Sequence, residues 1–399
     1  MQRLVKLVKF ASKLGWQFTV LTAEEQSSLI AEDPTLLSEI PDQTKIIRVP
    51  FDLPSNKASK ATYFKRWLSA LLFVPDSRKK WAEKAWQKLQ SFDLHRQFDL
   101  VLVSIPPYSL SFLAAKIQQN GGVPVVLDLR DPWTLNPYKI HPTPFHRWLD
   151  AKLERKYVGK ISFGISAYRR LLDFYAERWA EFKKENWRVI PNGFDDDDFK
   201  ELPSKPKNDQ HLFKIGFSGT VYSHLNHPTP LFKAMAHFSK QWPEQGAQLR
   251  FVHVGKSHID LKKLAARFSL ANQVQSLGYL PHKEALVRLN EMDSLCFVLS
   301  DRDARSRFTV GGKVYEYLRL AKPILALVPE DGEAADLIHE TKSGVAVSPQ
   351  NTEAIVSVLH QWLNGKHTGF KFENIEHYRR DVQAKQFVQF FNEILGGKN

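Results

Sequence analysis

The sequence is poor in cysteine: Cys296 is the single one in 399 residues. A lone cysteine excludes a disulfide framework and a zinc cluster built on cysteines, and it predicts a reducing compartment. The chain also lacks a run of about 18 uninterrupted apolar residues, the length that a membrane-spanning helix needs. Its longest candidate, residues 68–74, is far too short. We therefore expect neither a secreted disulfide-rich fold nor a transmembrane protein.

Apolar and charged residues are present in globular proportions. Hydrophobic residues make up 43% and charged residues 25% of the chain, with 27 Phe and 10 Trp. This composition excludes a disordered, collagen-like or low-complexity chain. A chain of 399 residues is long for one core, so we expect two domains of about 150 to 200 residues each.

Basic residues exceed acidic ones, 56 against 43, which gives a net charge of +13. Such an excess indicates an anionic partner: nucleic acid, phospholipid headgroups or a phosphorylated substrate. Near the start of the chain, Lys6, Lys9 and Lys13 interrupt the apolar residues at helical spacing, which predicts an amphipathic helix there.

The basic excess is concentrated between Lys57 and Lys88, where nine Lys and Arg residues face two acids. Aromatic residues, among them Trp67, Trp81 and Trp86, alternate with these charges. That mixture is typical of a segment resting on an anionic membrane surface. The alternative is a solvated helix face whose aromatic side chains pack inward. The sequence leaves both open.

Short runs rich in β-branched residues alternate with helix-length amphipathic segments, which predicts an α/β fold with parallel sheets. The expected strands are residues 18–22, 46–49, 100–105, 125–129, 163–166, 188–190, 214–218, 249–254, 274–277, 294–299, 324–328 and 344–347. The aperiodic, Asp-rich stretch 192–211 predicts a linker between two Rossmann-like halves, and residues 373–395 predict a long amphipathic helix.

A glycine pair, Gly311 and Gly312, opens a predicted helix directly after a loop. Unpaired amides at such a helix start favour a phosphate, and glycines permit close approach. Glu316 follows about one turn later, where a carboxylate can accept hydrogen bonds from ribose hydroxyls. The alternative is a plain loop–helix junction with a solvated Glu316.

Two acidic runs, residues 195–198 and 301–303, resemble a metal-binding Asp-x-Asp, but helix capping and solvation explain the first equally well. Asp131 follows a predicted strand, at the edge of a parallel sheet where ligands bind. It either orients an acceptor or caps a helix beginning near Trp133. The four histidines at positions 141, 146, 253 and 258 lack metal-ligand spacing and are interpreted as structural or surface residues.

Six motifs together resemble glycosyltransferase family 4 (group 1), and most closely its bacterial cell-surface polysaccharide branch. They are PDSRKKW (75–81), SIPPYS (104–109), DLRDPW (128–133), VIPNGFD (189–195), IGFSGTVY (215–222) and GGKVYEYLRLAKPIL (311–325). They occur in the family's order and spacing over nearly the whole chain.

This resemblance implies a GT-B architecture with two Rossmann-like domains facing across a cleft. The first domain, residues 1–195, would bind the acceptor, and residues 196–212 would link it to the second. The second domain, residues 213–372, would bind the nucleotide-sugar donor. Residues 373–399 would form a helix that crosses back to the first domain. The donor would be a UDP- or GDP-sugar, no metal would be obligatory, and the sugar would be transferred with retention.

The resemblance also assigns site residues. Glu316 matches the ribose-binding glutamate, the amides of Gly312 and Lys313 match the pyrophosphate contacts next to Gly311, and Gly219 and Thr220 match a glycine turn. The basic residue that usually follows this turn is missing, so arginines of a neighbouring loop would replace it: Arg302, Arg305 and Arg307. The acceptor or membrane side would comprise Arg78, Lys79, Lys80, Trp81, Ser109, Ser111, Arg130, Asp131 and Trp133, with Asp131 the catalytic candidate.

The chain departs from the family in other places too. Phe308 stands where a second glutamate is usual, near the donor sugar. The sequence also starts at the family's first helix, so the family's first strand and Gly-rich loop are expected to be missing. That strand would be central in the sheet. We expect residues 18–22 either to pair directly with 100–105 or to leave backbone groups unpaired.

The implied function is transfer of a hexosyl unit from a nucleotide diphosphate sugar to a lipid-linked or polysaccharide acceptor, at the inner face of the cell membrane. A nucleotide-sugar epimerase or hydrolase of the same architecture is one alternative, and a truncated relative of low activity is another. A nucleic-acid partner is not expected, because the basic excess lies beside a tryptophan-rich helix and not along a groove.

Overall fold

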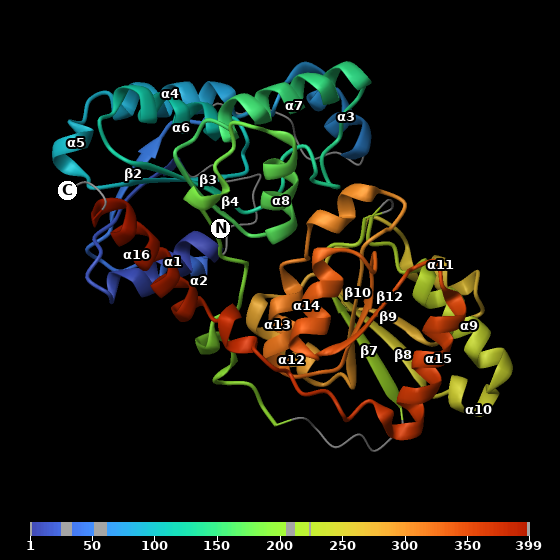
Figure 1. The fold of residues 1–399 in the computed structure, drawn as a ribbon. Helices are drawn as coiled ribbons and strands as arrows, with labels where there is room; N and C mark the ends of the chain where they lie inside the picture. Colours follow the sequence, from blue (N-terminus) through green and yellow to red (C-terminus); the bar gives the residue numbers. More distant parts are fainter. Residues whose placement is uncertain (1, 25–33, 52–61, 205–211, 223–224, 397–399) are drawn as a thin grey trace. The chain divides into compact units, whose positions relative to one another are not determined.

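A computed structural model describes residues 2–24, 34–51, 62–204, 212–222 and 225–396. Internal contacts divide the chain into two units, one of residues 1–192 with 380–399, the other of residues 193–379 (Figure 1). The chain therefore leaves the first unit near Asn192 and returns to it at Arg380. No helix in the described ranges combines the length and the apolar character that crossing a bilayer requires.

Unit 1 contains two parallel sheets. The smaller one pairs β1 (Thr19–Ala23) with β2 (Lys45–Val49). The larger one has the order β3-β4-β5-β6, with β3 Val101–Ile105, β4 Val125–Leu129, β5 Phe163–Ser166 and β6 Trp187–Val189. Its helices are α1 Gln2–Ser12, α2 Pro34–Leu37, α3 Thr62–Leu72, α4 Lys79–Leu89, α5 Leu94–Gln97, α6 Leu110–Asn120, α7 Pro144–Val158, α8 Arg169–Arg178 and α16 Arg380–Gly396.

The two sheets of unit 1 are not joined to each other in the described part of the chain. There β1 has β2 as its strand neighbour and β3 has β4, and the expected direct pairing of residues 18–22 with 100–105 is absent. Every residue of β1 is half-buried. The described residues therefore do not close the expected gap by pairing these two segments directly.

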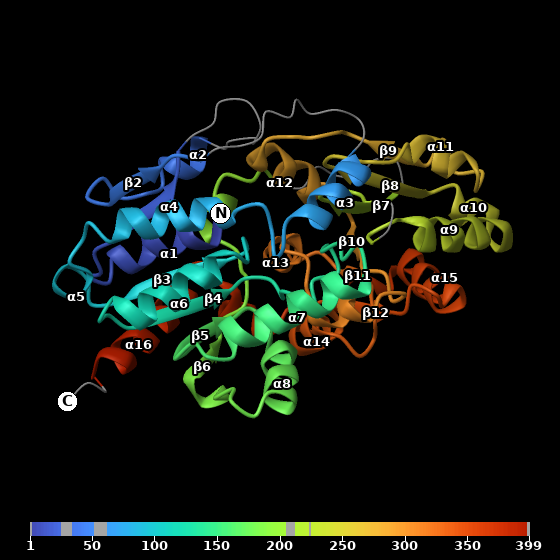
Figure 2. The same ribbon diagram turned by 90° about the horizontal axis from the view of Figure 1, so that it is seen from above.

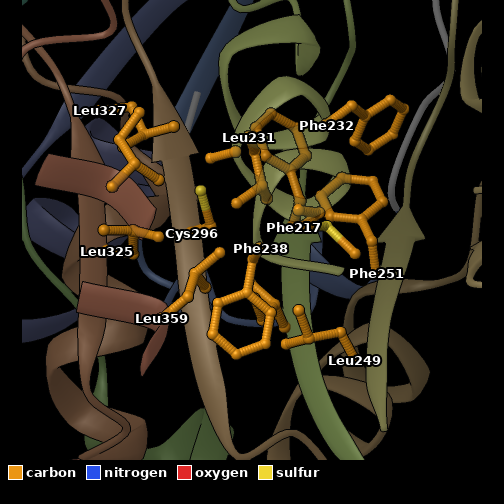
Figure 3. Packing of buried hydrophobic residues seen from close by; sticks show 14 of the residues in the cluster. Phe217, Leu231, Phe232, Phe238, Leu249, Phe251, Cys296, Leu325, Leu327 and Leu359 are labelled. Carbon is orange, nitrogen blue, oxygen red and sulfur yellow. The ribbon is translucent and has the colours of Figure 1, made fainter. Parts of the chain in front are cut away.

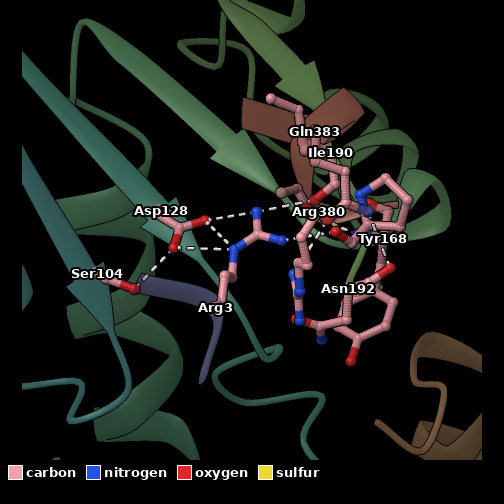
Figure 4. Close-up of polar contacts among 10 residues, drawn as sticks. Arg3, Ser104, Asp128, Tyr168, Ile190, Asn192, Arg380 and Gln383 are labelled. Atoms are coloured by element: carbon pink, nitrogen blue, oxygen red, sulfur yellow. Dashed lines mark hydrogen bonds and ion pairs between the residues drawn. The ribbon is translucent and has the colours of Figure 1, made fainter. Parts of the chain in front are cut away.

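Arg3 ties the separate parts of unit 1 together (Figure 4). It is 4% exposed, and its guanidinium donates to both carboxylate oxygens of Asp128 in β4, at 2.9 to 3.2 Å. The same guanidinium donates to the carbonyl oxygens of Ile190 and Pro191, where the chain leaves β6. Ser104 of β3 donates to the second Asp128 oxygen at 2.7 Å. A buried charge pair with all of these partners holds α1 against the strand ends.

The C-terminal helix α16 packs on α1 in unit 1. Phe387, Phe390 and Phe391 of α16 share a buried cluster with Leu7 and Ala11 of α1. This cluster covers the apolar side of the amphipathic helix that the sequence predicted. The predicted helix 373–395 starts too early, however, because residues 375–378 form a separate 3-10 turn in unit 2 and α16 begins at Arg380.

Unit 2 is built on one six-stranded parallel sheet of order β12-β11-β10-β7-β8-β9, which Figure 2 shows along its width. The strands are β7 Phe213–Ser218, β8 Leu249–Val254, β9 Val274–Ser276, β10 Ser294–Val298, β11 Ile324–Leu327 and β12 Gly344–Val347. The helices are α9 Thr229–Gln241, α10 Pro243–Gly246, α11 Leu261–Ala266, α12 His282–Asn290, α13 Lys313–Leu320, α14 Glu333–Thr341 and α15 Thr352–Gln361.

The core of unit 2 lies between this sheet and helices α9 and α15 (Figure 3). Phe232 and Phe238 of α9, Phe251 of β8 and Leu359 of α15 are all fully buried there. Cys296 is also fully buried in this core, and burial raises the pKa of its thiol, so the thiol stays protonated. The lone cysteine is thus a packing residue.

The predicted α/β class with parallel sheets is confirmed. All twelve predicted strands are present among the described residues, each with its ends within one residue of the prediction. The predicted linker 192–211 is partly structured: residues 196–199 form a 3-10 turn, and Phe194 and Phe199 are buried. Because these phenylalanines pack in unit 2, unit 2 begins at Gly193 and not after the linker.

The Arg3 contacts predict a large effect on stability. Arg3→Ala leaves Asp128 charged, buried and without its main partner, so we expect the free energy of unfolding to fall by about 3 to 5 kcal/mol. Urea unfolding of the full chain, followed by circular dichroism, measures this change. Lys13→Ala, at an exposed lysine directly after helix α1, is the control and should change stability by less than about 0.5 kcal/mol. A loss below about 1 kcal/mol for Arg3→Ala would contradict the role given to this residue.

Candidate functional site

The sheet of unit 2 has one point where its strand order reverses. The chain runs outward from β7 to β8 and β9, then returns to the other side of β7 to form β10, β11 and β12. The connections that follow β7 and β10 therefore leave in opposite directions. In open parallel sheets a ligand crevice forms outside the carboxyl ends of the strands at this switch point. The glycine turn and the glycine pair predicted from the sequence both lie in these two connections.

The turn after β7 is fixed by contacts to the turn after β8. Gly219 has a φ of +124°, and Gly255 has a φ of +144°. A Cβ on Gly255 would lie 2.2 Å from the carbonyl oxygen of Gly219, so the two backbones meet closely. His253 bonds the same Gly219 oxygen through Nε2 at 2.9 Å, and Asn226 donates to the carbonyl oxygen of Thr220 at 2.6 Å. Gly219 and Thr220 are thus held in one conformation.

The glycine pair lies at the start of α13, with Gly312 as the N-cap. A Cβ on Gly312 would meet nothing within 4 Å, and one on Gly311 would meet the Val314 side chain at 3.9 Å. Neither glycine is therefore required by packing inside the protein. Because neither glycine has a side chain, the space beside the helix start stays open. An anion can use this space to approach the first backbone amides of the helix.

Helix α13 is bound to the end of β7. The backbone amide of Ser218, the last residue of β7, donates to the hydroxyl oxygen of Tyr317 at 2.7 Å. Tyr317 is fully buried, so this bond locks the first turns of α13 against the strand. The glycine turn, the helix start and Glu316 therefore belong to one rigid arrangement in unit 2.

Glu316 is buried, with 7% of its surface exposed, yet it carries two basic partners. Lys313 Nζ lies 2.8 and 3.1 Å from its two oxygens, and His282 Nε2 lies 3.1 Å from Oε1. Burial raises the pKa of Glu316, but Lys313 and His282 outweigh burial and hold this pKa below its ordinary value. Glu316 is thus an ionised hydrogen-bond acceptor. The solvated alternative for Glu316 is wrong.

His282 was not predicted as a site residue. It lies 34 positions before Glu316, as the first residue of α12, and no spacing rule connects the two. His253 and Tyr317 were missed for a similar reason, since each supports the site through one contact that only the folded sheet creates. Pro281 before His282 marks a helix start in the sequence but gives no hint of its partner.

The predicted arginines lie in and beside the 3-10 turn η3 (Ala304–Phe308), in the connection from β10 to α13. Arg305 is paired with Asp303 at 2.7 Å and Arg307 with Asp331 at 3.0 Å, while Arg302 is exposed. Phe308, in the place of the family's second glutamate, is half-buried. Two of the three arginines therefore carry carboxylate partners in this state.

Asp131 lies in unit 1, in the loop that follows β4. No helix begins near Trp133 in this described stretch, and α7 starts at Pro144 with Thr143 as its N-cap, so the capping interpretation of Asp131 is wrong. Burial raises the pKa of Asp131, and neighbouring Arg130 partly offsets this effect. At this strand end, burial therefore favours the protonated form of Asp131 more than water would.

Several residues predicted to lie on the acceptor side form hydrogen bonds inside unit 1. Ser109 is fully buried, and its amide and hydroxyl both donate to Asp76, at 3.0 and 2.8 Å, which joins the PDSRKKW and SIPPYS motifs. The hydroxyl of Ser111 donates to a backbone carbonyl at 2.7 Å. Trp133 is fully buried and donates to Asp150 at 2.9 Å. Their first role is to hold the loops around Asp131.

The predicted basic segment divides into two helices. Residues 57–61 lie outside the described residues, and α3 and α4 form from the remainder. Trp81 of α4 donates to the Val49 carbonyl at 3.2 Å, while Lys79 and Lys80 are exposed. The guanidinium of Arg78 stacks 4.4 Å from the centre of the Phe51 ring. For Trp81 the inward-packing alternative therefore holds.

The acidic runs have partners that fit capping and ion pairing. Asp195 accepts from the Asp197 amide at 3.0 Å at the start of the 3-10 turn, and Asp303 accepts from the Arg305 amide at 3.0 Å. The predicted histidines make protein contacts as well: His141 bonds Asp150 at 2.8 Å. Within the described ranges no three His, Cys, Asp or Glu side chains form a group that could hold a metal.

Comparison with known proteins agrees with this geometry. Residues 198–380, nearly the whole of unit 2, match the family model of glycosyl transferases group 1. No curated protein sequence matches the chain. Among solved structures, the chain is similar to sucrose-phosphate synthase from Thermosynechococcus elongatus, with a TM-score of 0.69 and 14% identity over 98% of this chain and 92% of that one.

Two further structures share the fold. The lipopolysaccharide outer core galactosyltransferase WaaB has a TM-score of 0.60 at 13% identity, over 98% of this chain and 94% of that one. A putative UDP-N-acetylglucosamine 2-epimerase from Listeria monocytogenes has a TM-score of 0.56 at 11% identity, over 100% and 94%. These likenesses establish a fold similar to the GT-B glycosyltransferases. The family model that matches residues 198–380 is one of glycosyl transferases, and this match supports glycosyl transfer as the activity.

The depressed pKa of Glu316 predicts a pH effect on stability. A carboxyl whose pKa is lower in the folded state stabilises that state above its unfolded pKa, here about 4.5, and the stabilisation is lost as pH falls through the folded value. We therefore expect the wild type to lose more stability than Glu316→Gln between pH 6 and about pH 3. Urea unfolding of both proteins across this range measures the difference. Parallel losses in the two proteins would show that the ion pairs of Glu316 contribute nothing.

Proposed function

We propose that this chain moves a hexosyl unit from a UDP- or GDP-sugar to a lipid-linked or polysaccharide acceptor, with retention, at the inner face of the cell membrane in cell-surface polysaccharide biosynthesis. One observation carries the proposal. An ionised, buried Glu316 and an open helix start at Gly312 lie in one rigid arrangement at the switch point of a parallel sheet.

The arrangement fits the two polar parts of a nucleotide diphosphate. The Glu316 carboxylate can accept hydrogen bonds from two ribose hydroxyls. Those hydroxyls would replace Lys313 and His282, which hold the carboxylate now. The amides of Gly312 and Lys313 at the positive end of α13 would face the pyrophosphate. Gly219 and Thr220 would line the opposite side of the crevice, on the turn after β7.

The residues of unit 2 would also assist bond breaking. The oxygen of an acceptor hydroxyl bonds to the anomeric carbon, while the bond from that carbon to the β-phosphate oxygen breaks and the nucleoside diphosphate leaves with the electron pair. Negative charge grows on the leaving phosphate, where the dipole of α13 and the Lys313 ammonium stabilise it. The hydroxyl proton departs with the diphosphate. We propose no obligatory metal, since this charge is balanced by the protein.

Unit 1 would bind the acceptor, with Asp131 as the catalytic candidate that orients the acceptor hydroxyl, while the proton of that hydroxyl leaves with the diphosphate. The position of Asp131 directly after β4 supports that role. Ser109, Ser111 and Trp133 would act indirectly, by fixing the loops around Asp131.

Glu316→Gln should weaken nucleotide binding. A charge-assisted hydrogen bond contributes about 1.5 to 3 kcal/mol, so losing the charge should raise the Kd for UDP or GDP about tenfold or more. Calorimetric titration with both nucleotides measures Kd. An unchanged Kd in a folded Glu316→Gln protein would remove Glu316 from the site.

Gly312→Val should weaken binding at only a small cost in stability, since valine is a poorer N-cap than glycine but meets no protein atom at its Cβ. The new side chain meets no protein atom at its Cβ but covers the start of α13, so a donor phosphate can no longer approach the amides. Gly369→Val is the matched control, because a Cβ there also meets nothing within 4 Å. We expect a Kd increase of about tenfold or more in Gly312→Val and none in Gly369→Val. Equal Kd values in both variants would contradict a phosphate site at α13.

The reaction itself distinguishes transfer from epimerisation. The protein is incubated with UDP-glucose, UDP-galactose, UDP-N-acetylglucosamine and GDP-mannose, with and without bacterial lipid extract and with or without EDTA. We expect nucleoside diphosphate release with one donor that depends on the extract and not on metal. An epimerised or hydrolysed sugar formed without acceptor would establish the alternative activity. No turnover of any donor, in a protein that binds no nucleotide, would overturn the proposal.

A further inference from the structure

Five large apolar side chains of unit 1 are exposed on two helices that are distant in sequence. Leu68 and Leu72 lie on α3 and Phe73 directly follows it, with 41%, 65% and 42% of their surfaces exposed. Phe145 and Trp148 lie on the first turns of α7, with 61% and 56% exposed. We call these five residues the α3–α7 apolar face.

A side-chain bond joins the two parts of this face. The Nε2 of His146, between Phe145 and Trp148 on α7, donates to the carbonyl oxygen of Leu71 near the end of α3 at 3.1 Å. The Nδ1 of His146 accepts from the Thr143 hydroxyl at 2.7 Å, which fixes the ring. The rings of Phe145 and Trp148 lie 5.8 Å apart. The exposed side chains of α3 and α7 are therefore held as neighbours.

The charges of α7 are sorted by sign between its two sides. Both acids of the helix, Asp150 and Glu154, are 1% exposed and bound to internal partners. The basic residues Arg147, Lys152 and Lys156 are exposed. The Lys152 ammonium lies 5.2 Å from the centre of the Trp148 ring, so a positive charge lies next to the α3–α7 apolar face. The surface that α7 presents is thus apolar at its start and positive beyond it.

We propose that the α3–α7 apolar face inserts into an anionic lipid bilayer, with Arg147, Lys152 and Lys156 on the headgroups. Aromatic and leucine side chains flanked by basic residues are the composition that binds a membrane interface. Lysine is depleted in protein–protein interfaces, which makes a protein partner a poorer fit. This inference rests on the proposed function for the lipid-linked acceptor, and it moves the membrane contact from the predicted segment 57–88 to a surface that includes α7.

Co-sedimentation of the full chain with vesicles tests the proposal. Vesicles of phosphatidylcholine with about one third phosphatidylglycerol are compared with pure phosphatidylcholine, each at low and high salt. We expect binding to the anionic vesicles that weakens with salt. The double variant Phe145→Ser/Trp148→Ser should bind about tenfold more weakly or worse. Arg147→Gln and Lys156→Gln should each weaken binding about fivefold at low salt.

Tyr279→Ser is the matched control for lost aromatic surface, because Tyr279 on unit 2 is 61% exposed, as Phe145 is. It should leave vesicle binding unchanged. Circular dichroism verifies folding of each variant, and UDP titration of the double variant should give the wild-type Kd, since both substitutions lie in unit 1.

Three results would overturn the proposal: no binding of the wild type to anionic vesicles, equal binding of the double variant, or a wild-type dimer that the double variant disperses. The last would make this surface a contact between copies of the chain. Vesicle binding in a protein that binds neither UDP nor GDP would leave the membrane surface standing and contradict the proposed function instead.

Discussion

The return of the chain from β9 to β10, on the far side of β7, is the constraint on which the candidate site depends. It forces the connections after β7 and β10 apart, and every predicted donor residue lies in one of these connections or on α13. The Ser218–Tyr317 bond then closes the arrangement by tying the helix start to the strand. Without the reversal of strand order, Gly219 and Gly312 would have no common crevice to line.

Charge balance around Glu316 explains how this buried carboxylate stays ionised. Burial alone would favour the protonated form of Glu316, but Lys313 and His282 keep it ionised. A nucleotide that binds would exchange these partners for ribose hydroxyls and release the Lys313 ammonium toward the phosphates. The Lys313 side chain would thus stabilise the Glu316 carboxylate and then the leaving group, which suits a chain whose Arg305 and Arg307 are already paired.

Much of this was predictable because it is local. Apolar runs bounded by turn residues located all twelve strands, and the glycine pair before Glu316 located the helix start. The sequence could not reveal contacts that only the folded chain creates. These are the hydrogen bond between His282 and Glu316 and the hydrogen bond from Arg3 to Asp128, 125 positions away. The composition of residues 192–211 predicted a linker there. Phe194 and Phe199 in this segment are buried, and unit 2 begins at Gly193. The apolar face was missed because its two parts lie about 70 residues apart in sequence.

Hydrogen–deuterium exchange of the full chain, with and without saturating UDP or GDP, tests the central claim most directly. Bound nucleotide should slow exchange of backbone amides in two peptides, one covering residues 217–222 and one covering residues 309–317, and around His282. These regions should respond together, since the Ser218–Tyr317 bond makes them one structure. Protection confined to unit 1, or nucleotide binding that leaves the start of α13 unprotected, would contradict it.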